Sequence, residues 1–191
     1  MRATGVVAGW RLAVAGVALA TTWLPGPGYA GDNGPPLPSD IAVKAAFIYN
    51  FARFTEWPAL ASAAPIVVCV VGQDAIAAAL VKTFGGQSIG GHMLDTRLSQ
   101  DSATWRACHV LFVADLVTRQ SADGLGAVKA LPVLTVSDGK GFAQAGGIIE
   151  LFVEGGRMRF VINVDAVERS RLHISSRLLG LATIFRNGHI Q

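Results

Sequence analysis

The sequence predicts an α/β fold, namely a single three-layer domain with a mixed, mostly parallel sheet, flanking helices and a C-terminal hairpin. Short apolar, β-branched runs alternate with helical patterns in the first half of the chain, which is typical of parallel strands joined by helices. Near the C-terminus, two strand-like runs flank Glu154-Gly155-Gly156-Arg157, a hairpin signature. The 191 residues, 51% hydrophobic and 15% charged, can bury a core and are not those of a disordered chain.

The first 30 residues have the layout of a signal peptide. Arg2 precedes an apolar stretch centred on Leu12 to Leu24, and the small residues Gly28 and Ala30 precede the expected cleavage site. An uncleaved membrane anchor is the alternative interpretation. We therefore expect a signal peptide at 1–30, a flexible lead-in at 31–39 and the α/β domain at 40–190.

Export would leave a chain that is nearly neutral. Cleavage after Ala30 removes Arg2 and Arg11, which lowers the formal net charge from +3 to +1. Such a charge gives no reason to expect a nucleic-acid partner. No segment of the mature part is long and apolar enough to span a membrane, so we expect a soluble exported protein.

The first helix of the domain is expected to begin near Asp40 and to end at Trp57-Pro58, because the residue before proline disfavours helical geometry. Its apolar face carries a stripe at helical spacing, formed by Val43, Phe47, Phe51 and Phe54. A buried strand at 65–72 follows, because this run is β-branched and apolar at every position. An alanine-rich helix is then expected at 73–84, before Gly85-Gly86.

The remaining elements follow from the same patterns. We expect strands at 92–98, 110–114 and 133–136, a helix within 117–130, hairpin strands at 147–153 and 158–164, and a last helix at 175–185.

The two cysteines are expected to form a disulfide. Cys69 and Cys108 both lie in the mature part, and an even number of cysteines in an exported protein is usually paired. Two buried free thiols are the alternative. The spacing is far from a CxxC motif, so a thiol oxidoreductase is not indicated.

The sequence contains no convincing catalytic, metal or cofactor site. Gly86-Gln87-Ser88-Ile89-Gly90 matches G-x-S-x-G, but a helix precedes it where a nucleophile elbow needs a strand, so a glycine-rich turn is the better interpretation. A backbone anion site at Gly72-Gln73 lacks the GxGxxG fingerprint. The four histidines, at 92, 109, 173 and 189, have no metal-ligand spacing. We expect a protein that is not an enzyme and needs no cofactor.

One polar cluster stands out before the expected last helix. Its members are Arg169, Arg171, His173, Ser175, Ser176 and Arg177. One interpretation is a solvated turn in which Ser175 caps the helix. The other is a pocket for a small anion or a contact surface for a partner, since arginine can hold a carboxylate through two hydrogen bonds.

Taken together, these segments resemble the YfiR-type family of periplasmic proteins (YfiR/HmsC-like). Residues 43–58 are similar to the opening helix of that family, Ile66–Gly72 to a strand, and Cys108–Phe112 to a Cys-His-Val-Leu-Phe run. Further similarities lie at 134–137, 146–149, 160–164 and 175–182. The resemblance covers about residues 40–186, and the order of several motifs makes it specific.

The resemblance implies regulation without catalysis. Members of the family bind the periplasmic sensor domain of an inner-membrane diguanylate cyclase and repress cyclic-di-GMP synthesis and biofilm formation. They are typically homodimers, and an OmpA-like outer-membrane lipoprotein can sequester them. Cys69 and Cys108 match one family cysteine pair, while a second pair of some members is missing, so the bond here would be mainly structural. Arg171 and His173 fall where the family has a polar pocket for small ligands.

Three hypotheses follow for this chain. The first is a periplasmic repressor with the aromatic first helix as a candidate partner surface, although core packing is the simpler interpretation of Phe47, Phe51 and Phe54. The second is a small-ligand-binding module that uses Arg171 and His173 and has no cyclase partner. The third is a hydrolase at Ser88.

Overall fold

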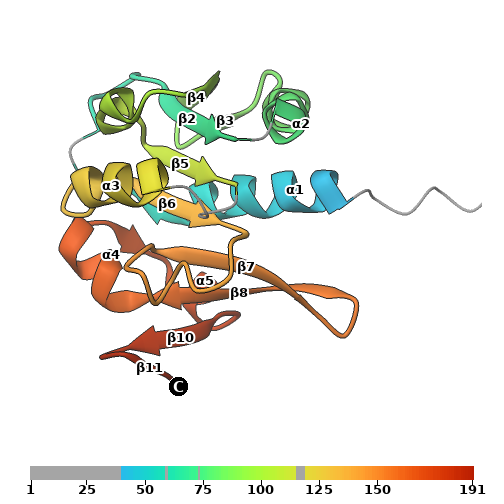
Figure 1. Cartoon of the computed structure of the whole chain (residues 1–191). Coiled ribbons are helices and arrows are strands. Elements are labelled where there is room, and N and C mark those ends of the chain that lie inside the picture. Colours follow the sequence, from blue (N-terminus) through green and yellow to red (C-terminus); the bar gives the residue numbers. More distant parts are fainter. Residues whose placement is uncertain (1–39, 59, 73, 115–118) are drawn as a thin grey trace, which may run out of the picture. The chain divides into compact units, whose positions relative to one another are not determined.

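A nine-stranded sheet organises the part of the chain that the computed structural model describes, which is residues 40–58, 60–72, 74–114 and 119–191 (Figure 1). Its strands are β2 (Ile66–Val71), β3 (Ser88–Ile89), β4 (His92–Leu98), β5 (Val110–Val113), β6 (Leu134–Ser137), β7 (Ile149–Glu154), β8 (Arg157–Asn163), β10 (Thr183–Arg186) and β11 (His189–Ile190). Their order across the sheet is β11-β10-β8-β7-β6-β5-β2-β4-β3, so a two-residue strand forms each edge.

The sheet is mixed and mostly parallel, as the sequence predicts. Strands β4, β2, β5, β6 and β7 pair in parallel, and β7 and β8 form the predicted antiparallel hairpin. The last pair, β10 and β11, is also antiparallel, while β10 is parallel to β8. A separate two-stranded antiparallel sheet joins β1 (Thr55–Glu56) to β9 (His173–Ile174).

Helices cover both faces of the sheet. They are α1 (Asp40–Arg53), α2 (Asp74–Phe84), the 3₁₀ helix η1 (Ser102–Ala107), α3 (Arg119–Val128), α4 (Val164–Ser170) and α5 (Ser176–Leu179). Apolar side chains of α1, α2, α4 and α5 pack in one core, and those of η1 and α3 pack in a second. Figure 1 shows α1 and α3 on opposite sides of β5 and β6.

Strand β2 shows why the central strands are apolar at every position. Val68 and Val70 belong to the larger core, whereas Val67 and Cys69 belong to the core under η1 and α3. Successive side chains of a strand point to opposite faces, so a strand with helices on both sides has no solvent-facing position. Of the described helices, none has the length and apolar character needed to cross a membrane.

The predicted last helix at 175–185 is wrong. Only α5 is helical, and the chain then enters β10, which pairs with β8 and buries Phe185. The segment Thr183-Ile184-Phe185 is β-branched and aromatic, which suits a strand beside an existing edge better than a helix. The spacing of leucines along this segment could not show that the edge of β8 was free to pair with another strand.

The first helix also ends earlier than the sequence predicts. Helix α1 stops at Arg53, because Thr55–Glu56 leaves helical geometry to pair with β9, which lies over a hundred residues later. The helix α4 was not predicted at all. Asn163 caps it by accepting a hydrogen bond from the Ala166 backbone N–H at 2.9 Å. The predicted signal peptide and lead-in lie outside the described residues.

Candidate functional site

The aromatic stripe of α1 lines an open apolar groove of about 470 Å³. Strand β8 contributes Phe160 to the groove, and the segment at α5 contributes Leu178 and Leu181. The apolar side chains that line it are Ala42, Val43, Ala46, Phe47, Phe51, Phe54, Phe160, Leu178 and Leu181. The single polar lining residue is Asn50, whose amide already donates to the Ala46 carbonyl at 2.9 Å.

The aromatic residues of the stripe differ in burial. Phe51 is buried and packs edge-on against Phe160, with ring centres 5.0 Å apart. Phe47 and Phe54 are only partly buried, although Phe47 also touches Phe160 at a ring-centre distance of 5.9 Å. Leu181, at the rim, is 74% exposed. An apolar groove with an exposed leucine at its rim is suited to bind an apolar side chain of a partner.

The four predicted ligand or partner residues lie on four successive local structures. Arg169 is in the last turn of α4, Arg171 is its left-handed C-cap, His173 is in β9 and Arg177 is in α5, and all four are exposed. Ser175 caps α5 as the sequence predicts, by accepting a hydrogen bond from the Arg177 backbone N–H at 3.3 Å. None of the four lines the groove.

His173 nevertheless lies next to a second pocket, through the pairing of β1 with β9. It is opposite Glu56 in that pair, and Glu56 lines a pocket of about 360 Å³. The other polar side chains that line this pocket are Arg53, Thr55 and His92, while Trp57 and Ile66 are among its apolar lining. A cation, a carboxylate and an imidazole around one pocket can bind a small polar ligand.

A partly buried histidine, His109, is hydrogen-bonded to Trp57 of this pocket. The His109 ring accepts a hydrogen bond at Nδ1 from the Val67 backbone N–H, at 3.0 Å. The Trp57 indole donates to the His109 carbonyl oxygen at 3.2 Å. Burial lowers the pKa of His109 below its usual value, and the charge of His92 contributes further to the lowering. His109 is therefore a neutral structural acceptor that links β2, β5 and the pocket wall.

The predicted disulfide is confirmed. Cys69 in β2 is bonded to Cys108, which directly follows η1. The pair lies in the smaller core beside Trp105 and Leu111. The bond therefore ties η1 to the centre of the sheet.

Ser88 does not lie on a nucleophile elbow. It is exposed, in the two-residue strand β3 between α2 and β4. Gly86 and Gly90 on either side have φ of 72° and 59°, as glycines in tight turns do. Within the described ranges, no three His, Cys, Asp or Glu residues are placed to hold a metal ion.

Sequence reasoning found the α1 side of the groove but missed its other wall. Phe160 was assigned to a hairpin strand and Leu181 to a helix, and neither assignment places the residue beside α1. No local pattern could have shown this, because these residues meet α1 only through the fold of the sheet.

Comparison with known proteins identifies one family. The family model described as YfiR/HmsC-like matches residues 41–183. A solved structure of a conserved domain protein from Vibrio cholerae O1 biovar El Tor is similar, with 14% identity and a TM-score of 0.45. The match covers 76% of this chain and 60% of that chain, so the present chain spans less than two thirds of that chain. No curated protein matches the chain.

Proposed function

The chain belongs to the YfiR/HmsC-like family, and from that premise we propose that it is a periplasmic regulator of cyclic-di-GMP signalling. It binds the periplasmic sensor domain of an inner-membrane diguanylate cyclase and represses cyclic-di-GMP synthesis, and with it biofilm formation. It acts by binding and performs no catalysis.

The observation that carries this proposal, beside the family, is the apolar groove of α1. A protein outside the membrane can change an enzyme inside it only by binding one state of a membrane partner more tightly than another. The groove provides a contact surface for that purpose, since the rings of Phe47, Phe51 and Phe160 pack together in its floor and Leu181 is exposed at its rim. We propose that it takes an apolar side chain of the sensor domain in its inactive arrangement.

The proposed location is the periplasm, reached through a signal peptide at 1–30. The leader pattern supports it, as does the Cys69–Cys108 bond, because disulfides persist in oxidising compartments. We propose in addition that the protein is a homodimer and that an OmpA-like outer-membrane lipoprotein competes for it.

The first test is cellular cyclic-di-GMP in the native host with and without this gene. Deletion should raise cyclic-di-GMP, and an exported copy should restore it, whereas a copy lacking residues 1–30 should not. An unchanged level under several growth conditions would contradict the repressor.

The groove is tested separately with Leu181→Asp. A carboxylate at the rim has to be desolvated when an apolar partner binds, so we expect affinity for the sensor domain to fall at least about tenfold and repression to be lost. Val153→Asp is the matched control, because Val153 is 61% exposed but lies on β7 and does not line the groove. Equal loss in both variants, or in neither, would remove the groove from the proposal.

The second candidate function is a small-ligand-binding module. The pairing of His173 with Glu56, beside the pocket of Arg53 and His92, favours it. Thermal unfolding with a panel of small carboxylates and phosphates should then show stabilisation that is lost in Arg53→Ala, since Arg53 lines this pocket. A stabilisation that Arg53→Ala leaves unchanged but Arg171→Ala removes would place the ligand at Arg171.

A further inference from the structure

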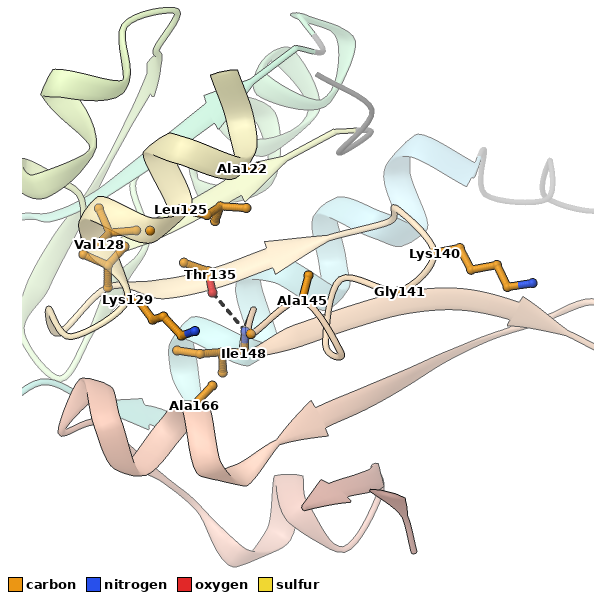
Figure 2. A pocket seen from close by; sticks show the side chains of 13 residues that line it. Ala122, Leu125, Val128, Lys129, Thr135, Lys140, Gly141, Ala145, Ile148 and Ala166 are labelled. Carbon is orange, nitrogen blue, oxygen red and sulfur yellow. Dashed lines mark hydrogen bonds between the residues drawn. The ribbon is translucent and has the colours of Figure 1, made fainter. Parts of the chain in front are cut away.

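A third pocket lies on the opposite face of the sheet from α1. It has a volume of about 380 Å³ and lies between α3, β6, the loop before β7, and α4 (Figure 2). Most of its lining is apolar, including Leu125, Val128, Val133, Ala145, Ile148 and Ala166. This volume is within the usual range for small-molecule pockets.

Lys129 lines this pocket, and the exposed Arg169, which is not one of its lining residues, approaches it at Gly146. The ammonium of Lys129 would lie 3.1 Å from a Cβ atom built on Gly146, and the Arg169 guanidinium nitrogen Nη2 would lie 3.9 Å from it. Both head groups are therefore within 4 Å of one point. Figure 2 shows the Lys129 side chain pointing toward Ile148, while that of Lys140 points away. Because Gly146 has no side chain, the Lys129 ammonium can lie close to its backbone.

No carboxylate neutralises these two cations in the described structure. The lining of the pocket contains no acidic residue, and neither Lys129 nor Arg169 forms an ion pair with any residue that the structure describes. Three carboxylates of the surrounding elements have other partners. Glu150 accepts backbone N–H groups, Asp138 pairs with Lys44 at 2.8 Å, and Glu168 approaches Arg186 at 3.8 Å.

We propose that this pocket binds a small organic anion, whose carboxylate or phosphate head is held by Lys129 and Arg169 and whose apolar body fills the space beneath α3. Two like charges close together repel each other, and an anion between them removes that repulsion. The guanidinium can hold either head group through two hydrogen bonds, and the ammonium acts as a point charge. The Thr135 hydroxyl lines the same space and is already occupied as an acceptor, from the Ile148 N–H at 3.0 Å.

In this proposal, Arg169 acts apart from Arg171, His173 and Arg177, although all four are close in the sequence. Arg169 belongs with Lys129, which lies forty residues earlier, whereas His173 belongs with the pocket of Arg53 and Glu56. It does not depend on a cyclase partner, because the pocket and the α1 groove share no residue.

The test is calorimetry on the purified exported chain with three probes of similar shape. Phenylacetate and phenyl phosphate carry the two candidate head groups, and phenylacetamide is the neutral analogue. We expect at least one anion to bind at least tenfold more tightly than the amide. The Lys129→Met/Arg169→Met variant should lose that binding at least tenfold, because it keeps the aliphatic stems and removes both charges.

Two further variants complete the design. Lys82→Met/Arg157→Met removes the same charges from exposed positions outside the pocket and should bind like the wild type. Ala145→Phe, which fills the pocket and keeps both cations, should also weaken binding. Binding of none of the probes, equal binding of the amide, or equal loss in the control variant would overturn the proposal. A ligand here with unchanged cyclic-di-GMP in a deletion strain would remove the repressor and leave this site standing.

Discussion

Glu150 shows how one buried carboxylate can order a loop without a cation beside it. The residue is 7% exposed, and its two oxygens accept the backbone N–H groups of Gly141 and Ala143 at 3.1 and 3.0 Å. A carboxylate can only accept hydrogen bonds, so it suits a site where both neighbours are donors. The loop before β7, which forms one wall of the proposed anion pocket, is held in place by this residue.

Glu150→Gln should therefore destabilise the protein by about 1–3 kcal/mol, because the introduced amide presents its own N–H group to a backbone donor. The free energy of unfolding in urea measures the effect. Glu154→Gln, in the same strand but exposed, should change stability by less than about 0.5 kcal/mol. Equal stability of the two variants would show that the loop does not depend on the carboxylate.

His109 predicts a pH dependence of stability. Its pKa is lowered in the folded state, so the unfolded chain binds a proton more readily. Neutral His109 contributes its full share of the unfolding free energy at pH values above about 6.5, the usual pKa of histidine in an unfolded chain. That contribution is lost as the pH falls from there through the lower pKa of His109 in the folded protein. Protonation at Nδ1 would also remove the acceptor for Val67.

The unfolding free energy, measured at a series of pH values from neutral downward, should fall in the wild type. His109→Gln should show a smaller fall over the same interval, since glutamine does not titrate. Identical slopes in the two proteins would assign the effect to another group.

At the scale of elements, α3 packs closely against η1 at Gly124. A Cβ at Gly124 would overlap the indole ring of Trp105, which is fully buried. Gly126, two residues later in the same helix, has nothing within 4 Å of the corresponding position. One helix thus offers a glycine required by packing and a glycine that is not.

Gly124→Ala should lower stability by about 1–3 kcal/mol through overpacking. Gly126→Ala should be neutral or should raise stability by up to about 1 kcal/mol, because alanine is the better helix former. The midpoint temperatures of thermal unfolding of the two variants measure this difference. A Gly124→Ala variant more stable than the wild type would mean that Trp105 can move aside at little cost in free energy.

The elements that sequence patterns predicted well are those whose burial is decided locally. Strand β2 and strand β5 are apolar at every position, and the strand expected at 92–98 is present with the same ends. The segment after Ser175 is a wrong prediction, because Phe185 fits a helical stripe as well as a strand, and only pairing with the edge of β8 decides between the two. Residues 55–56 likewise leave the helix for a partner that is distant in the sequence.

The candidate sites divide in the same way. The α1 stripe and the cysteine pair could be predicted, since helical spacing and parity are visible in the sequence. The meeting of Lys129 with Arg169 could not, because it depends on how α4 returns beside the loop that holds Gly146. Phe160 joined the groove for a similar reason, through the position of β8 in the sheet.

For the whole molecule, the disulfide is the one covalent tie between distant segments of the described chain. It closes a loop of 39 residues between β2 and the end of η1. In the chain-entropy picture such a loop is worth about 4 kcal/mol, through restriction of the unfolded chain. The folded sheet itself does not require the bond, because β2 and β5 already pair along their lengths.

The variant Cys69→Ala/Cys108→Ala should accordingly fold but unfold at a lower urea concentration, with a loss of about 2–4 kcal/mol. Reduction of the wild type by dithiothreitol should reproduce the loss and should leave the variant unchanged. A variant as stable as the wild type would indicate that the unfolded chain is already compact in this region.

The two short edge strands have a consequence for how this molecule can associate. β3 and β11 are two residues long, and positive-φ glycines lie in the adjoining turns at Gly90 and Gly188. β3 pairs only with His92 and Met93, so among the described strands none covers residues 94–98 of β4 on their outer side. At the opposite edge, β11 covers Phe185 and Arg186 of the four-residue strand β10. A strand of another chain is therefore expected to add at β4 and not at β11, and a mutation that lengthens β3 should close that position.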